Sequence, residues 1–320
     1  MNASETPHPE GAGNVAASAA RPTGAPPAFS ASGLGKRYRG NWALRDCSLS
    51  LPAGRVIALV GPNGAGKTTL LQLAVGLLTP TRGQVRVFGE PVGGDAALQR
   101  VAFLAQDKPL YADFTVSEML RFGRRLNPRW DDDLAQRRLV ELDIPLNRKV
   151  GSLSGGQRTQ VALTVAVAKR PDLLVLDEPL ADLDPLARHD VTRALMAAVA
   201  ETQMTVLFSS HVVPDLEGTC DWLVVLNRGR VQVSADIDEL VSAHSLITGP
   251  ADSADAIAAQ HQVVARSSAG RQASLLVRGT SAIVDPRWTT RSVGMEDIVL
   301  AYLRDPDAAA LLPPTLPVLN

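Results

Sequence analysis

The sequence has few cysteines, no long hydrophobic run and no excess of charge of either sign. Its 320 residues include only two cysteines, Cys47 and Cys220, and neither lies in a C-x-x-C or Cys/His cluster. Two cysteines cannot build a disulfide framework, and their spacing does not suggest a zinc site. A reducing, cytoplasmic compartment fits this pattern best.

The charge balance and the short apolar runs exclude further classes of protein. Lys and Arg number 32 against 33 Asp and Glu, so the formal net charge is −1. This balance gives no electrostatic footprint for a polyanion, and we expect no nucleic-acid partner. The longest apolar runs, such as 173–176 and 223–226, are far shorter than the roughly 20 residues of a membrane-spanning helix. We therefore expect a chain that does not cross a membrane.

From residue 29 to about 240, short β-branched runs alternate with longer helical patterns. This alternation predicts an α/β fold with a mostly parallel sheet covered by helices. Between 106 and 153 the strand signal vanishes, and two helical patterns follow the N-cap residues Thr115 and Asp131. We expect a helical subdomain at about 107–160. The expected strands are 55–60, 101–105, 173–176 and 205–208, and the expected helices are 67–77, 115–126 and 131–142.

The two ends of the chain differ from this central domain. Residues 1–28 contain mostly Ala, Pro, Gly and Ser, without the apolar stretch of a signal peptide, and predict a disordered tail. After a Gly-Pro break at 249–250, a helical pattern, two β-rich runs and an amphipathic helix at 295–303 predict a small α/β accessory region over 241–304. Residues 305–320 predict a flexible tail, in which Leu311, Leu312 and Leu316 are available to dock on a surface.

A phosphate-binding motif lies near the start of the central domain. Residues 61–68, Gly-Pro-Asn-Gly-Ala-Gly-Lys-Thr, match G-x-x-x-x-G-K-[ST] between an expected strand and an expected helix. Glycines in this context let backbone N–H groups point at phosphate oxygens, and the helix presents its positive N-terminus to the same anion. We expect Lys67 to reach the β- and γ-phosphates and Thr68 to bind Mg²⁺, with Thr69 adding a phosphate contact.

Two carboxylates end a buried apolar run. Asp177 and Glu178 follow residues 173–176, and this places them at the carboxyl edge of the sheet, where open α/β folds bind ligands. We expect Asp177 to bind Mg²⁺ through water and Glu178 to polarise the attacking water.

A second anion-binding helix start is predicted at residues 153–157, Leu-Ser-Gly-Gly-Gln. Gly155 and Gly156 precede a helical pattern that extends to about residue 169, with Ser154 as its N-cap and Gln157 three residues later. Together with the phosphate loop, this run makes residues 29–240 resemble the ATP-binding cassette (ABC) family. The resemblance implies a P-loop NTPase core with a mostly parallel sheet, an antiparallel β subdomain and a helical subdomain.

The same resemblance implies roles for further residues. Tyr38 matches the aromatic residue that stacks on adenine, with Trp42 as the alternative, and Gln106 matches the glutamine that contacts Mg²⁺ and water. His211 matches the histidine that touches the γ-phosphate. Asp184 matches the loop through which two cassettes communicate, although Ala181 stands where the family more often has a small hydroxyl residue. The expected catalytic residues are Glu178, His211 and Gln106, the metal-binding residues are Thr68, Gln106 and Asp177, and the nucleotide-binding residues are Tyr38, Gly61, Pro62, Asn63, Gly64, Ala65, Gly66, Lys67, Thr68, Thr69, Ser154, Gly155, Gly156, Gln157 and Asp184.

The resemblance also implies a dimer, because a single chain has one phosphate loop and one Leu-Ser-Gly-Gly-Gln run. In the family that the chain resembles, the run of one protomer closes on the nucleotide held by the other. We therefore expect a homodimer, or a pseudo-symmetric heterodimer with another cassette, around two ATP molecules and Mg²⁺.

From the resemblance we expect the ATP-hydrolysing subunit of an ABC transporter, peripheral on the inner face of the cell membrane and paired with a separate transmembrane permease. The ending at 292–303 resembles export-type subunits. Residues 121–130 include Phe122, Trp130 and four arginines, and form either a solvated helix face or the surface that meets the permease. A soluble ABC ATPase that remodels a nucleic-acid or ribosomal partner is the alternative. An inactive regulator is a third hypothesis, which the presence of Lys67, Asp177, Glu178 and His211 disfavours.

Overall fold

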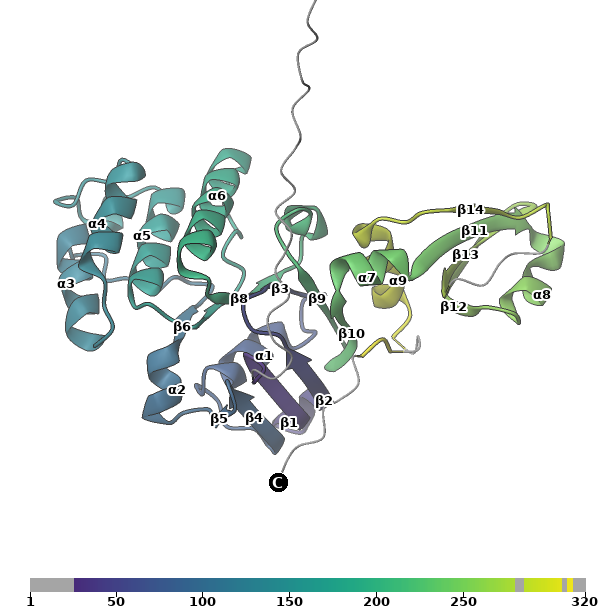
Figure 1. Ribbon diagram of the computed structural model, residues 1–320, viewed down its shortest axis with the longest axis horizontal. Coiled ribbons are helices and arrows are strands. Elements are labelled where there is room, and N and C mark those ends of the chain that lie inside the picture. Colours follow the sequence, from purple (N-terminus) through teal and green to yellow (C-terminus); the bar gives the residue numbers. More distant parts are fainter. Residues whose placement is uncertain (1–25, 280–284, 307–309, 313–320) are drawn as a thin grey trace, which may run out of the picture.

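Figure 1 shows the computed structural model, an elongated molecule with a helical end, a central sheet and a separate accessory region. The structure describes residues 26–279, 285–306 and 310–312. Most of the expected tail at 1–28 and Leu316 lie outside these residues. Ala28 is described and is buried. Its N–H donates to the carbonyl of Leu51, and its carbonyl accepts from the N–H of Phe88. Ordered packing therefore begins before residue 29.

The central sheet is mostly parallel, as the sequence predicts. β3, β6, β7, β8 and β9 run parallel to one another, and β10 pairs antiparallel with β9 at one edge. The order across the sheet is β10-β9-β3-β8-β7-β6. Its strands are β3 (Val56–Val60), β6 (Val101–Leu104), β7 (Leu173–Leu176), β8 (Thr205–Ser210), β9 (Trp222–Asn227) and β10 (Arg230–Asp236).

Both faces of this sheet are covered, which explains why its strands are continuous apolar runs. In β3, Ala58 and Val60 pack on the side that carries the helical subdomain, whereas Ile57 and Leu59 pack on the side of α1 (Lys67–Ala74). Beyond α1 lies an antiparallel sheet of order β2-β1-β4-β5. Its strands are β1 (Phe29–Tyr38), β2 (Asn41–Leu51), β4 (Arg82–Val87) and β5 (Glu90–Pro91).

The helical subdomain lies at the far end of the molecule from the accessory region (Figure 1). Thr115 and Asp131 cap α3 and α4 as the sequence predicts, and Thr115 forms a capping box with Glu118. The helices from α2 to η2 along the chain are α2 (Asp95–Arg100), α3 (Val116–Leu126), α4 (Asp132–Glu141), η1 (Val150–Ser152), α5 (Gly155–Ala168), α6 (Pro185–Thr202) and η2 (Val213–Leu216).

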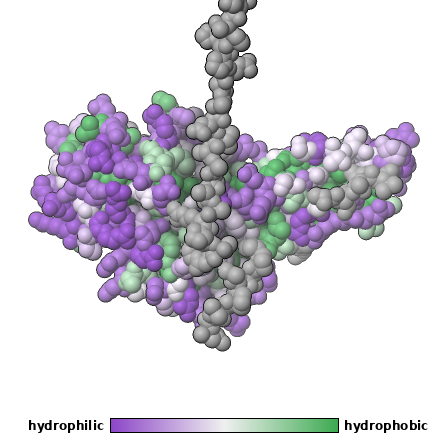
Figure 2. Space-filling view, viewed as in Figure 1, coloured by the Kyte–Doolittle hydropathy of each residue, from purple (hydrophilic) through white to green (hydrophobic). Residues whose placement is uncertain are grey.

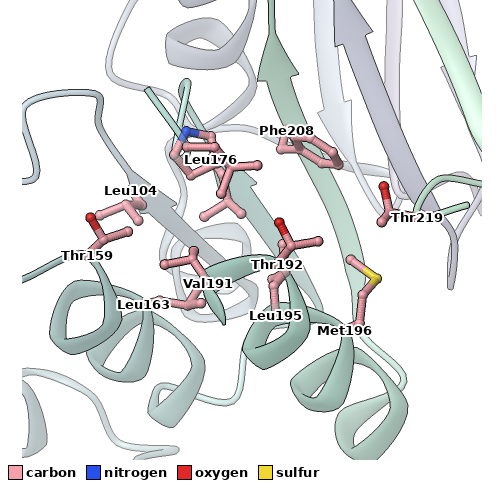
Figure 3. Close-up of a pocket in the computed structure, with 12 residues that line it drawn as sticks. Leu104, Thr159, Leu163, Leu176, Val191, Thr192, Leu195, Met196, Phe208 and Thr219 are labelled. Carbon is pink, nitrogen blue, oxygen red and sulfur yellow. The ribbon is translucent and has the colours of Figure 1, made fainter. Parts of the chain in front are cut away.

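A small apolar cavity of about 10 Å³ lies where α5 and α6 cover the central sheet. Figure 3 shows Val191 and Leu195 of α6 facing Leu104 and Phe208 of the sheet across this space. The cavity is close to the minimum size that holds one water molecule, and its lining is almost entirely apolar. Because of this void, α6 does not pack fully against residues 179–180, which also line it.

The accessory region is an antiparallel sheet of order β12-β13-β11-β14 with its own small core around Ile247, Leu275 and Trp288. The sequence predicts its two long strands and its last helix. It does not predict β11, whose end at Gly249-Pro250 reads as a break. The elements are α7 (Ile237–Ser242), β11 (His244–Pro250), η3 (Ala251–Ser253), α8 (Ala254–Ala258), β12 (Gln262–Ala269), β13 (Gln272–Arg278), β14 (Thr289–Arg291) and α9 (Met295–Arg304).

The accessory region is joined to the core through α7, α9 and β10. In Figure 2, hydrophobic residues gather on the visible face near this junction, whereas the helical subdomain is mostly hydrophilic. Leu311 also returns to the core, because its N–H donates to the carbonyl of Gln232 and its carbonyl accepts from Ser234, both in β10. Leu311, which the sequence analysis gives as available to dock on a surface, therefore lies against the edge strand of the central sheet.

Candidate functional site

A cleft of about 620 Å³ opens at the carboxyl ends of β3, β6, β7 and β8. It brings together residues that are up to 173 positions apart in the sequence, from Tyr38 to His211. The residues lining the cleft are Tyr38, Ala43, Asn63, Gly64, Gly66, Lys67, Thr68, Thr69, Gln106, Glu178, Ala181, Asp182 and His211.

The phosphate loop between β3 and α1 can adopt its tight conformation because of its glycines. Gly66 is the N-cap of α1 with φ +106°, a backbone conformation that residues with a side chain rarely adopt. A Cβ on Gly61 would lie 2.2 Å from the carbonyl oxygen of Leu226, so only glycine permits this close approach. The first N–H groups of α1 therefore face the cleft at the positive end of the helix.

Lys67 is buried at the floor of this cleft, with only 6% of its side chain exposed. Its Nζ donates to the carbonyl of Gly61 at 2.8 Å and lies 3.3 Å from Glu178 Oε1. The second carboxylate oxygen of Glu178 lies 2.9 Å from His211 Nδ1. Lys67, Glu178 and His211 thus form one continuous polar chain across the cleft.

Ser209 contacts both strand-end acidic residues, through the carboxylate of Asp177 and the backbone of Glu178. Its Oγ donates to Asp177 Oδ1 at 2.7 Å and accepts from the N–H of Glu178 at 2.8 Å. Asp177 is 1% exposed behind the cleft wall, whereas Glu178 has the left-handed φ of +45° that turns its side chain into the cleft. Sequence reasoning did not assign a role to Ser209, although a hydroxyl at the end of the neighbouring strand was a usable signal.

The two candidate adenine-stacking residues occupy different places. Tyr38 lines the cleft and is 42% exposed, which leaves its ring accessible to a base. Trp42 lies instead between the guanidinium groups of Arg37 and Arg82, 5.8 and 5.4 Å from its ring centre. Tyr38 is therefore the one of the two residues that lines the cleft.

The residues expected from the second motif line a separate cleft of about 350 Å³ at the start of α5 and α6. Ser154 caps α5 in a capping box with Gln157, in which each residue's side chain accepts from the other's N–H at 3.2 Å. Asp184 caps α6 by accepting from Ala187 at 2.9 Å. Ser154, Gly156, Gln157 and Asp184 line this second cleft, while Lys67 lines the first. One chain therefore carries two half-sites that do not face each other.

The basic segment at 121–130 is less exposed than the sequence suggests. Phe122 is partly buried in an aromatic cluster with Tyr111 and Phe114, at ring distances of 5.4 and 6.2 Å. Trp130 is also partly buried, and its indole N–H donates to Asp132 at 2.7 Å. Tyr111, which packs against Phe122 in this cluster, is 53% exposed.

Next to this surface, a cleft of about 230 Å³ separates α2 from the end of α3. Leu98 and Leu126 line it and are 46% and 63% exposed, and Asp95 and Arg129 add charges of both signs. In the part of the chain that the structure describes, we find no helix with the length and apolar character needed to span a bilayer.

Known proteins resemble this chain over about two thirds of its length. The family described as "ABC transporter" matches residues 44–181. An uncharacterized ABC transporter ATP-binding protein of Bacillus subtilis, YxlF, is 34% identical over 224 residues, which cover 66% of this chain and 72% of that protein. Nod factor export ATP-binding protein I of Rhizobium leguminosarum bv. viciae is 35% identical over 212 residues, covering 64% of this chain and 68% of its own length.

Among solved structures, cbiO1 from Clostridium perfringens, described as part of the ABC transporter complex cbiONQ, superimposes with a TM-score of 0.60 and 25% identity. The match covers 68% of this chain and 91% of that structure. This match confirms the predicted fold class, an α/β P-loop core with a mostly parallel sheet, an antiparallel β subdomain and a helical subdomain.

Proposed function

Since the chain belongs to the ATP-binding proteins of ABC transporters, a family of ATPases, we propose that it couples ATP hydrolysis to export through a separate membrane subunit. The observation that carries the proposal is the polar chain of Lys67, Glu178 and His211 beside the phosphate loop. These residues supply a phosphate ligand, a base and a hydrogen-bonding group at one point of one cleft.

The cleft binds ATP along its length. Tyr38 stacks on the adenine, and the N–H groups at the start of α1 hold the phosphates. Lys67 binds the β- and γ-phosphates, for which it leaves the carboxylate of Glu178. Support for this arrangement comes from Tyr38, Lys67 and Thr69 lining the same cleft.

The residues present fit a magnesium ion. Thr68, Gln106 and Asp177 offer a hydroxyl, an amide and a carboxylate, and oxygen donors of this kind together with substrate phosphates are what Mg²⁺ prefers. Ser209 occupies Oδ1 of Asp177 and fixes the direction of the carboxylate. When bound, the ion neutralises charge that develops on the phosphate oxygens. Asp177 acts from behind the cleft wall, through water.

Glu178 activates the attacking water as a general base. Once ATP has taken Lys67, the carboxylate keeps His211 as a neighbour and gains room for a water molecule. His211 is half exposed, so its ring can turn from Glu178 toward the γ-phosphate. Gln106, which lines the same cleft, orients the water.

The second half-site completes the first across a dimer. The start of α5 offers N–H groups and the hydroxyl of Ser154, which is the arrangement that binds an anion. Because these groups lie in a different cleft from Lys67, a second cassette has to bring them to the γ-phosphate. We take another copy of this chain as that cassette, with a separate cassette of the same kind as the alternative.

The membrane subunit docks on the cleft between α2 and α3. Leu98 and Leu126 are exposed apolar side chains that line this cleft, and interfaces concentrate apolar anchors within a polar rim. With this contact, the chain works at the cytoplasmic face of the membrane in our proposal. Export rather than import is supported by the Nod factor export proteins among its relatives.

Affinity capture from detergent-solubilised membranes tests the proposal. The full chain should recover a multi-span membrane protein, and Leu126→Asp should lose it while still binding ATP. Val140→Asp is the matched control, because Val140 is another exposed apolar residue at 73%, on α4. Capture of ribosomes or DNA-repair factors in place of a membrane protein would refute transport, and a Lys67→Ala protein with wild-type ATP hydrolysis would refute the site.

A further inference from the structure

The turn between β9 and β10 supports the phosphate loop from behind. The N–H of Gly229 donates to the carbonyl of Ala65 at 3.0 Å, and the carbonyl of Gly229 accepts from Arg45 at 2.7 Å. Just before the turn, the carbonyl of Leu226 lies against Gly61. The position of this turn therefore helps to set the backbone of the loop that holds the phosphates.

The same turn is attached to the accessory region by the side chain of Asn227. Asn227 is 5% exposed, and its Nδ2 donates to the carbonyls of Leu303 at 3.0 Å and Tyr302 at 3.4 Å. Both carbonyls belong to the last turn of α9, where a helix has no donors of its own for them. Asn227 thus links the end of α9 to the residues that contact Ala65.

The last turn of α9 is in turn fixed within the accessory region. The Tyr302 hydroxyl lies 3.2 Å from His244 Nε2, and His244 Nδ1 lies 2.7 Å from the carbonyl of Leu240. A displacement of the accessory region therefore moves the carbonyls that Asn227 binds.

From these contacts we infer that Asn227 is a positioning residue for ATP binding, through which α9 and the accessory region control the phosphate loop. The inference rests on the proposed binding of ATP by that loop. It gives residues 241–304 a role in the ATPase cycle: docking of α9 holds the loop ready for phosphate, and a partner that pulls on the accessory region weakens nucleotide binding.

A matched control exists on the neighbouring strand. Gln232 in β10 is also a buried amide, 3% exposed, and its Nε2 donates to the carbonyl of Asp305 at 2.8 Å. Both amides hold the end of α9, but only Asn227 is next to the turn that contacts the phosphate loop. If both amides only held α9 in place, replacing either one would lower the stability equally, and neither replacement would change ATP binding.

The test compares the full-length chain with Asn227→Leu and Gln232→Leu, measuring binding of a fluorescent ATP analogue, KM and kcat for ATP, and melting temperature. Asn227→Leu should raise the Kd and the KM roughly threefold to tenfold, the effect of one lost hydrogen bond, with kcat changed less than about twofold. Both variants should lower the melting temperature by similar amounts, but Gln232→Leu should leave the KM unchanged. If Asn227→Leu does not fold, Asn227→Ser takes its place, because the shorter side chain does not reach α9.

Equal KM values for the two leucine variants would overturn the inference, as would an Asn227→Leu protein that changes only in melting temperature. A wild-type chain that binds no ATP would instead refute the proposed function. Normal ATP binding that is indifferent to Asn227 refutes the positioning role alone.

Discussion

Lys67 and Glu178 form an ion pair across the candidate nucleotide cleft, with 3.3 Å between Nζ and Oε1. Both groups are largely buried, at 6% and 12% side-chain exposure, so their attraction is less screened than that of a surface pair. An arriving triphosphate has to compete with Glu178 for Lys67. Binding of ATP thereby releases the carboxylate that we propose as the base.

Replacing Glu178 with Gln should separate binding from hydrolysis. Loss of the base should lower kcat about 100-fold or more, while the affinity for ATP stays equal or rises because Lys67 loses a competing carboxylate. Sizing with ATP should show the trapped dimer. Glu201→Gln, which changes a surface acid paired with Arg137, should behave as the wild type. Undiminished turnover of a Glu178→Gln protein that remains monomeric with ATP would contradict this account.

The docking of α9 should weaken in mild acid. Burial, with a smaller contribution from the positive charge of Arg278, lowers the pKa of His244 below its ordinary value near 6.5. The unfolded chain then binds more protons than the folded one, so the free energy of unfolding should fall as the pH drops below about 6.5. The slope from this residue is at most about 1.4 kcal/mol per pH unit.

The variant His244→Gln should remove that part of the pH dependence, because its amide does not titrate between pH 7 and 5. Chemical denaturation of both proteins at several pH values measures the difference. An identical pH profile for the two proteins would show that His244 titrates alike in the folded and unfolded states.

The N-cap of α4 should contribute measurably to stability. Asp131 accepts from the N–H of Leu134 at 2.9 Å and from Arg170 Nε at 2.8 Å, and these contacts lower the pKa of its carboxyl group. Asp131→Ala should cost about 1–2 kcal/mol of unfolding free energy. The loss should be present at neutral pH, shrink as the pH falls below about 4, where the unfolded chain takes up the proton, and disappear below the lowered pKa of the folded carboxyl group. Asp133→Ala, at an exposed position of the same turn, should cost less than about 0.5 kcal/mol.

The cavity beneath α6 makes a packing prediction (Figure 3). Val191→Ile directs one more methylene into the space of about 10 Å³ and should raise the free energy of unfolding by up to about 0.8 kcal/mol. Leu195→Ala enlarges the same space and should cost about 2–5 kcal/mol. Urea titrations measure both. A destabilised Val191→Ile protein would indicate that the cavity walls cannot accommodate the added group.

Local rules predicted the elements whose signals lie within a few residues of each other. Thr115 and Asp131 cap helices because their side chains reach N–H groups three residues away, and Asp177 and Glu178 end a strand that is apolar on both faces. Gly61 and Lys67 were likewise identified from one contiguous motif. Such signals need no knowledge of the rest of the chain.

Outside the residues that the family resemblance assigned to the nucleotide site, contacts between distant segments were not predicted. Asn227 reaches carbonyls 75 and 76 residues away, and Ser209 reaches an acid 32 residues away, so neither has a local pattern. Strand β11 was missed because Gly249 and Pro250 resemble a break, whereas Gly249 leaves room for the ring of Trp288. In each case the deciding partner comes from another element.

The central claim is that ATP closes the phosphate loop of one chain on the start of α5 of another. Two proteins in the Glu178→Gln background, each with one added cysteine, test it: one carries Asn63→Cys and the other Arg158→Cys, both at exposed positions. Burial raises the pKa of Cys47 to about 11 and that of Cys220 to about 12, so the native thiols react slowly at neutral pH.

A short bismaleimide should join the two proteins when they are mixed with ATP and magnesium, giving a covalent dimer that neither protein forms alone. Mixtures in which the Asn63→Cys and Arg158→Cys chains remain separate with ATP, or are joined equally without it, would contradict the head-to-tail arrangement.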